Sequence, residues 1–263
     1  MALSLMTSAT VNAQEAPKPA LVVYAAGSTT GALGAILKRF TAETGELVEL
    51  KTGPAGLMRE RIEAGDAVDL FVSANMAHPQ KLHDEGRGGP VAVFAHNRLC
   101  VTAQHEVGLT SANLLDRLLD PKVRIGTSTP KADPGGDYAI AFFERADQVR
   151  PGATAILKAK ARQVVGSTIE PLPTQAKTAR EGMIERGVDV STGYCSSRST
   201  TPDTSVDKIE VPANLAIPVD YGMTIVTNAK NPSREAAAGQ LAMYLLSPPS
   251  QAMLVPYGFE PAN

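Results

Sequence analysis

The sequence has no tryptophan, only two cysteines among 263 residues, and no excess of basic side chains. With 25 basic and 27 acidic residues the net charge is −2, which argues against a nucleic-acid-binding protein, because such proteins concentrate positive charge on one face. Its hydrophobic runs stay well short of the roughly 20 apolar residues that a membrane-spanning helix needs. A hydrophobic content of 43% is nevertheless enough for the core of a globular protein with one large or two smaller domains.

Cys100 and Cys195 are too few for a disulfide scaffold and lack the spacing of a metal site. Two buried free thiols are the default expectation for such a pair. Both cysteines lie in strand-like runs, so a bridge between them can form if the protein is exported to an oxidising compartment. The four histidines show no metal-ligand spacing either. The sequence therefore predicts neither a bound cation nor a cofactor.

Residues 1–20 look like the end of a secretory signal and a linker rather than part of the fold. A short apolar patch precedes small residues near Ala13, and a polar spacer with Pro17 and Pro19 follows. We expect export to the periplasm with cleavage near Ala13. Because the basic n-region is missing and the apolar part is short, the signal is expected to be truncated. The alternative is a disordered N-terminal tail.

The fold is organised around residues 22–31, where an apolar strand-like run ends at Gly27 and a helix follows. Apolar residues at helical spacing predict this helix over residues 30–44, with Ser28 and Thr29 as its N-cap hydroxyls. The first amides of a helix lack internal partners and lie at the positive end of its dipole, so such a turn can bind an anion. The simpler interpretation is that Ser28 only caps its own helix.

Strands alternate with helices along the rest of the chain, which predicts an α/β fold with helices covering mainly parallel sheets. Two long apolar runs with polar interruptions, residues 90–103 and 215–226, are interpreted as strands that cross between two lobes. Lobe 1 would contain residues 21–97 and 222–263, and lobe 2 residues 98–221. The other predicted helices and strands cover residues 48–50, 57–64, 69–74, 79–86, 114–119, 123–127, 138–146, 153–160, 174–186, 189–195 and 234–246, with a proline-broken link at 171–173.

Several short blocks have the order and separation found in the periplasmic molybdate-binding proteins of ABC importers, and the chain resembles that family over most of its length. The blocks lie at residues 25–28, 53–56, 62–65, 69–75, 133–139, 193–195, 245–248 and 257–259. The resemblance implies a two-lobed type II periplasmic-binding-protein fold in which the two crossing strands act as a hinge.

The same resemblance implies a tetrahedral oxyanion, molybdate or possibly tungstate, as ligand in the cleft between the lobes. Any metal would enter as the centre of the oxyanion and not as a cation held by side chains. The implied partner is the membrane permease of an ABC transporter, and we expect the protein to be a monomer.

The resemblance also assigns residues to the ligand. A hydroxyl after the first strand binds a ligand oxygen in that family, and Ser28 matches it. Ala55 stands where the family has a second serine, and losing that donor should cost on the order of 1.5–3 kcal/mol. Backbone amides before a lobe 2 helix correspond to Gly135 and Gly136, and a tyrosine hydroxyl at the end of a lobe 2 strand corresponds to Tyr194.

A further amide of the family's site falls on Ala176 or Lys177, at the start of the helix predicted over residues 174–186. Lys131, Arg98 and Lys177 are interpreted as solvated surface groups rather than ligands. A site made of neutral donors suits a fully ionised dianion, and we expect an acidic side chain in the cleft to repel it. Such a site predicts weak binding of anions that still carry a proton.

Two classes of function remain open at this stage. One is a transport-binding protein whose anion, given Ala55, could also be sulfate-like or a small organic acid. The other is an enzyme or ligand-sensing domain on the same scaffold, since a fold does not fix a function. No nucleophile–base pair can be identified, and residues 196–201 lack glycine, so they are predicted to form a loop rather than a phosphate cradle.

Overall fold

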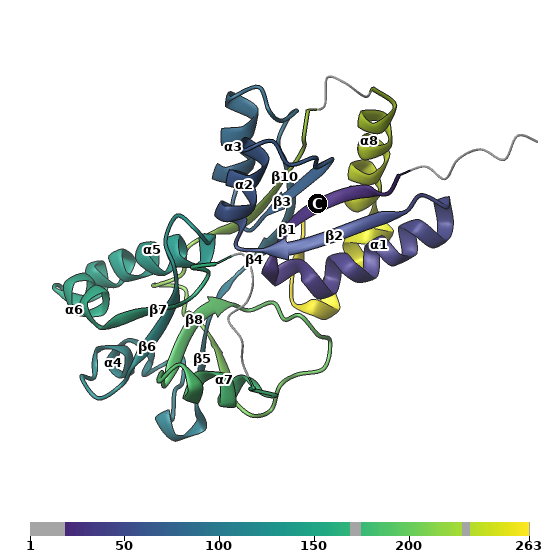
Figure 1. The fold of residues 1–263 in the computed structure, drawn as a ribbon. Coiled ribbons are helices and arrows are strands. Elements are labelled where there is room, and N and C mark those ends of the chain that lie inside the picture. The colour runs from purple at the N-terminus through teal and green to yellow at the C-terminus, as the bar shows by residue number, and fades with distance from the viewer. Residues whose placement is uncertain (1–18, 169–174, 228–231, 263) are drawn as a thin grey trace, which may run out of the picture.

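The computed structural model describes residues 19–168, 175–227 and 232–262. Within these residues the chain forms two β-sheets, each flanked by helices (Figure 1). Most of the signal-like segment and the link predicted at residues 171–173 lie outside the described residues. No helix in the described part of the chain is both long and apolar enough to cross a membrane.

The first sheet has six strands in the order β11-β4-β10-β3-β1-β2. β1 is parallel to β2 and β3, whereas β10 is antiparallel to β3 and β4. Helices α1 and α8 lie on one side of this sheet and α2 and α3 on the other (Figure 1). The elements of this lobe are β1 (Leu21–Ala26), η1 (Gly27–Thr29), α1 (Thr30–Thr44), β2 (Val48–Gly53), α2 (Ala55–Glu63), β3 (Leu70–Ser73), α3 (Ala77–Asp84), β4 (Ala92–Asn97), β10 (Val219–Ile225), α8 (Pro232–Leu246), α9 (Pro248–Ala252), η3 (Val255–Tyr257) and β11 (Glu260–Pro261).

The second sheet has five strands in the order β7-β6-β8-β5-β9. β6 is parallel to β7 and β8, and β5 is antiparallel to β8 and β9. The elements of this lobe are β5 (Leu99–Ala103), η2 (His105–Val107), α4 (Leu114–Leu119), β6 (Ile125–Ser128), α5 (Pro134–Val149), α6 (Ala153–Lys160), β7 (Ala161–Val165), α7 (Ala179–Glu185), β8 (Val190–Tyr194) and β9 (Asp207–Glu210).

Both sheets are mixed rather than mainly parallel. The antiparallel pairs involve β4, β5 and β10, the strands next to the crossings between lobes. The chain leaves lobe 1 at the end of β4 and returns to it at β10, so these two neighbouring strands run in opposite directions. The helices predicted from the alternation cover both sheets. Part of each sheet is parallel, as expected, and the rest is antiparallel.

The first crossing between the two sheets lies at Arg98. β4 ends at Asn97 in the first sheet and β5 begins at Leu99 in the second, so only Arg98 separates the two sheets along the chain. The interruption in the apolar run is therefore the point at which the chain changes lobe.

The return crossing differs from its prediction. β10 pairs only within the first sheet and starts at Val219, before the lobe boundary expected at residue 222. Residues 211–218, which join β9 to β10, form no strand. Pro212 and Pro218 lack the N–H that a ladder needs, which accounts for the break.

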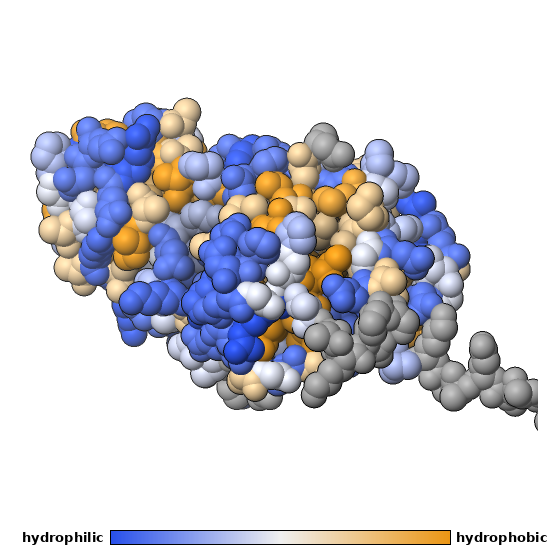
Figure 2. Space-filling view, turned by 90° about the horizontal axis from the view of Figure 1, so that it is seen from above, coloured by the Kyte–Doolittle hydropathy of each residue, from blue (hydrophilic) through white to orange (hydrophobic). Residues whose placement is uncertain are grey.

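Helix α1 matches the predicted span and buries the predicted face. Leu33, Ile36, Leu37 and Phe40 are buried, and Gly45 ends the helix in the left-handed conformation with φ 75°. This face packs toward β2 and α8. From above, hydrophilic side chains cover most of the surface, with hydrophobic ones gathered between them near the middle (Figure 2).

Cys100 and Cys195 form a disulfide, which joins β5 to the residue after β8. Their Cα atoms are 4.8 Å apart, as expected for neighbouring strands. The default expectation of two free thiols is wrong, and the bridge that the sequence analysis left open for an exported protein is present. Because Cys195 N also donates to Arg98 O at 2.8 Å, the bridge lies next to the first crossing.

Candidate functional site

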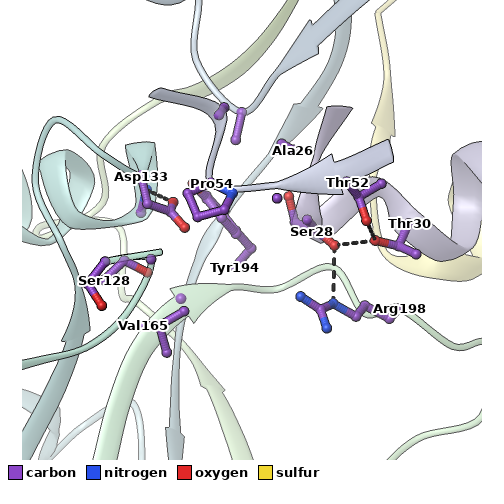
Figure 3. A pocket seen from close by; sticks show the side chains of 18 of the residues that line it. Ala26, Ser28, Thr30, Thr52, Pro54, Ser128, Asp133, Val165, Tyr194 and Arg198 are labelled. Carbon is purple, nitrogen blue, oxygen red and sulfur yellow. Dashed lines mark hydrogen bonds between the residues drawn. The ribbon is translucent and has the colours of Figure 1, made fainter. Parts of the chain in front are cut away.

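A cavity of about 530 Å³ lies between the two lobes (Figure 3). Lobe 1 lines it with the turn after β1, the turn between β2 and α2, and Ala74 after β3. Lobe 2 lines it with the turn before α5 and the residues at the ends of β7 and β8. Of the predicted site residues, Ser28, Ala55, Gly135 and Tyr194 line this cavity, and Gly136 does not.

Ser28 lies in the short 3₁₀ turn that joins β1 to α1, and it does not cap the helix. Its hydroxyl shares a hydrogen bond of 2.9 Å with Tyr221 Oη. Thr29 does not cap it either, because its Oγ1 donates to Ala26 O at 2.7 Å. The predicted N-cap is wrong because Thr29 already has helical backbone angles, so the chain enters α1 without the extended residue that a cap requires. Ser28 is thereby left on the cavity wall.

Ala55 is the first residue of α2, and its side chain is buried. The next two amides, of Gly56 and Leu57, donate across the cleft to Ala132 O in lobe 2 at 3.0 and 3.4 Å. These amides are therefore not open to an anion. A Cβ on Gly56 would lie 2.1 Å from Lys131 O, so only glycine permits this approach of the two lobes.

Gly135 and Gly136 lie in the first turn of α5, which begins at Pro134 rather than at the predicted residue 138. Gly135 N donates to Asp133 Oδ1 at 2.8 Å, and Gly136 N donates to Asp133 O at 2.9 Å. A Cβ on Gly136 would lie 2.4 Å from Pro130 N, so this glycine serves the packing of the turn. Both amides already have acceptors in this structure.

Asp133 places a carboxylate in the cavity, contrary to the expectation that the cleft has no acidic side chain. Oδ1 accepts the Gly135 N–H, and Oδ2 has no hydrogen-bond partner among the described residues. Burial, the largest influence, raises the pKa of Asp133, and nearby Asp137 raises it further. The hydrogen bond from Gly135 N–H and the charge of Arg198 act in the opposite direction. An Asp followed by Pro at the first position is a typical helix start, so the sequence did contain this signal.

Arg198 brings a positive charge to the cavity wall, and the sequence prediction missed it. It belongs to the predicted loop 196–201 of lobe 2, and its Nε donates to Gly27 O of lobe 1 at 3.1 Å (Figure 3). Arg98, by contrast, forms ion pairs with Glu210 and Glu260 at 2.7 and 2.9 Å, as expected of a surface group. The cavity wall therefore carries both an acidic side chain, Asp133, and a basic one, Arg198.

Tyr194 ends β8 and lines the cavity, where its buried hydroxyl has no hydrogen-bond partner in the described part of the chain. Burial raises the pKa of Tyr194 well above its usual value, so the hydroxyl keeps its proton and remains a donor. The ring stacks edge-on against Tyr138 and Tyr221 with centroid distances of 6.2 and 5.6 Å. The neighbouring rings restrict its position, and its hydroxyl has no acceptor among the described residues.

A buried hydrogen-bond network links the cavity to the first crossing. Asn97, the last residue of β4, donates through Nδ2 to Ser196 Oγ at 2.9 Å and to Tyr221 Oη at 3.2 Å. Since Tyr221 also bonds Ser28, side chains of both lobes meet in one network beside Arg98. Ser28 and Ser196 are the two members that line the cavity.

Ala176 and Lys177 do not provide the predicted amide at a helix start. Helix α7 begins at Ala179, capped by the hydroxyl of Thr178, which accepts from Glu181 N. Lys177 N donates to Glu181 Oε2 at 2.6 Å, completing a reciprocal cap. Neither predicted residue is among the described residues that line the cavity. The described residues also contain no cluster of three His, Cys, Asp or Glu that could hold a metal ion.

The sequence pattern of one family, described as bacterial extracellular solute-binding protein, matches residues 21–260. The uncharacterized protein PM1146 of Pasteurella multocida is 36% identical over 183 residues, which cover 68% of this chain and 76% of that protein.

Two solved structures share the fold. The periplasmic molybdate-binding protein of Azotobacter vinelandii superposes with a TM-score of 0.70 and 18% identity, over 91% of this chain and 98% of that one. The periplasmic binding protein AfuA of Actinobacillus pleuropneumoniae, with fructose-6-phosphate bound, gives a TM-score of 0.70 at 17% identity, over 93% and 85%. The two-lobed type II periplasmic-binding-protein fold is thereby confirmed, and the chain belongs to the bacterial extracellular solute-binding proteins.

Proposed function

We propose that this protein is the periplasmic solute-binding component of an ABC importer and that it binds a small oxyanion in the cavity between its lobes. The observation that carries the proposal is the buried hydroxyl of Tyr194, a residue that lines the cavity, because this donor has no acceptor among the described residues. A buried hydroxyl left unpaired costs about 1–3 kcal/mol. An oxygen of the ligand would remove that cost.

The remaining donors lie around the same space. Ser28 contributes a hydroxyl from lobe 1, and Arg198 contributes positive charge from lobe 2. A ligand that contacts both lobes binds the closed arrangement better than an open one, so it shifts the population toward closure. Periplasmic binding proteins are a well-established example of such hinge closure around a ligand.

Molybdate and tungstate are the first ligands to test. The support for molybdate is the resemblance of the sequence blocks and the molybdate-binding protein among the similar folds. The similar structure with fructose-6-phosphate supports a wider set of anions, as does the methyl group of Ala55 in the cavity wall. An enzyme receives less support, because Ser28 and Ser196 bond to Tyr221 and Asn97, neither of which is a general base at neutral pH.

The test is a thermal-shift survey followed by calorimetric titration with molybdate, tungstate, sulfate, inorganic phosphate and small carboxylates. An anion at 100 times its Kd should stabilise the protein by about 2.7 kcal/mol, and the melting temperature should rise by several degrees, at about 2–4 °C for each kcal/mol. Tyr194→Phe should weaken that binding, because it removes the hydroxyl and keeps the ring.

Tyr244→Phe is the matched control, because the Tyr244 hydroxyl bonds exposed Glu43 outside the cavity. Affinity should be unchanged in this variant. If none of the anions shifts the melting temperature, or if Tyr194→Phe and Tyr244→Phe bind alike, the proposed oxyanion site is wrong.

A further inference from the structure

We propose that the ligand is a phosphate group with its own hydrogen-bond donor, either the P–OH of hydrogen phosphate or a hydroxyl of a small phosphate ester, and that Asp133 accepts this hydrogen bond. The inference rests on the oxyanion-binding function proposed above and narrows its ligand. It follows from the carboxylate that the structure places in the cavity.

An ionised carboxylate can only accept hydrogen bonds. Asp133 uses Oδ1 for Gly135 N, and Oδ2 has no partner among the described residues although the side chain points into the cavity (Figure 3). A fully ionised dianion such as sulfate or molybdate also has only acceptors, so beside Asp133 it would bring like charges together without a bridging proton. A ligand donor turns that repulsion into a charge-assisted hydrogen bond.

Two neighbouring groups, the Gly135 N–H and Arg198, favour the ionised form of Asp133, in which the carboxylate only accepts hydrogen bonds. The first amides of α5 favour negative charge at this end of the helix, and Gly135 N already bonds it. Burial, the largest influence, and Asp137 raise the pKa of Asp133, whereas the Gly135 N–H bond and Arg198 oppose that rise. Tyr194 and Tyr221, which also lie near Asp133, keep their protons because burial raises the pKa of each.

Positive charge and negative charge lie at separate parts of the cavity wall. Arg198 comes from the loop after β8 and contacts Gly27 of lobe 1, while Asp133 caps α5. This arrangement suits a ligand with its charge directed to Arg198, Ser28 and Tyr194 and its donor directed to Asp133.

The cavity is also larger than a bare tetrahedral ion requires. Its volume is about 530 Å³, within the range of about 300–1,000 Å³ for small-molecule pockets. Five heavy atoms fill only a fraction of that space, given about 30 Å³ for a whole water molecule in the liquid. The remaining volume could hold the organic part of a phosphate ester.

The test is calorimetric titration at pH 7.5 with inorganic phosphate, glycerol 3-phosphate, sulfate and molybdate, on the wild type and on Asp133→Asn. We expect the wild type to bind at least one of the two phosphates at least tenfold more tightly than sulfate. Asp133→Asn should reduce this preference to less than threefold, because its amide can donate to sulfate and removes the negative charge. Preference for inorganic phosphate identifies the P–OH as donor, and binding of the ester alone identifies its hydroxyl.

Two comparisons make the result specific. Asparagine is as good an N-cap as aspartate, so Asp133→Asn should fold, and its melting curve checks this. Asp116→Asn makes the same change in charge at an exposed ion pair with Arg150 and should leave the preference unchanged. Binding of sulfate or molybdate without any preference for phosphate overturns this inference alone. Absence of binding by all four anions overturns this inference, and if the tungstate and small carboxylates of the survey above do not bind either, the proposed function is overturned as well.

Discussion

The approach of Gly56 to lobe 2 allows closure of the cleft to be tested with one methyl group. In Gly56→Ala the new Cβ would lie 2.1 Å from Lys131 O and 2.8 Å from Ala132 O. To reach an ordinary contact of 3.4 Å the lobes must separate by roughly 1.3 Å at this point. The variant should therefore favour an open cleft.

The size of the effect follows from two contributions. The hydrogen bond of 3.0 Å from Gly56 N to Ala132 O would be lost, which costs about 0.5–1.5 kcal/mol. Residual crowding in a packed contact costs typically about 1–3 kcal/mol. The closed state is thus weakened by at least about 1.5 kcal/mol, and a ligand that needs closure should bind at least about tenfold more weakly.

Calorimetry with inorganic phosphate measures the affinity, and small-angle scattering of the saturated protein measures closure through the radius of gyration. Gly34→Ala is the matched control, because its added Cβ would meet nothing within 4 Å. It should keep the wild-type affinity and gain up to about 1 kcal/mol of stability, since alanine favours helices. If Gly56→Ala binds and closes like the wild type, the contact with Lys131 is not part of the ligand-bound state.

Three further outcomes are expected. Ser28→Ala should weaken calorimetric binding of phosphate by about 1–3 kcal/mol with an unchanged circular dichroism spectrum, and unchanged affinity would remove Ser28 from the site. Replacing Cys100 and Cys195, which lie 95 residues apart, by serine should lower the free energy of unfolding in denaturant by about 2–5 kcal/mol; equal midpoints would contradict this. Burial, with Arg59 adding, lowers the pKa of His78 to about 4, so the unfolded chain binds this proton first as the pH falls. Stability should therefore drop between about pH 6.5 and pH 4, by up to about 3 kcal/mol from this group, and less in His78→Gln.

The elements with a strong periodic signal could be predicted from the sequence. α1, α4 and α6 have the predicted bounds, because apolar residues at helical spacing mark each of them, and Gly45 and Pro121 follow the ends of α1 and α4. β7 and β9 were missed. These are the two edge strands of the second sheet, and most of their side chains are exposed or half-buried, so their sequences have little apolar pattern. Pairing with β6 and β5, rather than their own composition, makes them strands.

The candidate site was predicted in part. The resemblance pointed to Ser28, Ala55, Gly135 and Tyr194, which all line the cavity, and their role in ligand binding stays a prediction. Asp133 and Arg198 were missed, because their places in the cavity wall depend on the folded turn before α5 and on the contact of Arg198 with Gly27 of lobe 1. Local charge patterns do not show which groups face a cleft. The occupied amides were also missed, since their acceptors lie in the other lobe or in the turn before the helix.

The rings beside the cleft have a spectroscopic consequence. With no tryptophan, the aromatic absorption of this protein comes from six tyrosines and six phenylalanines. Tyr194 belongs to lobe 2 and Tyr221 to lobe 1, and their centroids are only 5.6 Å apart in an edge-on pair. Movement of one lobe against the other changes the distance and angle between these two chromophores. Near-ultraviolet circular dichroism can therefore follow opening of the cleft in the unlabelled protein, without a tryptophan signal to obscure it.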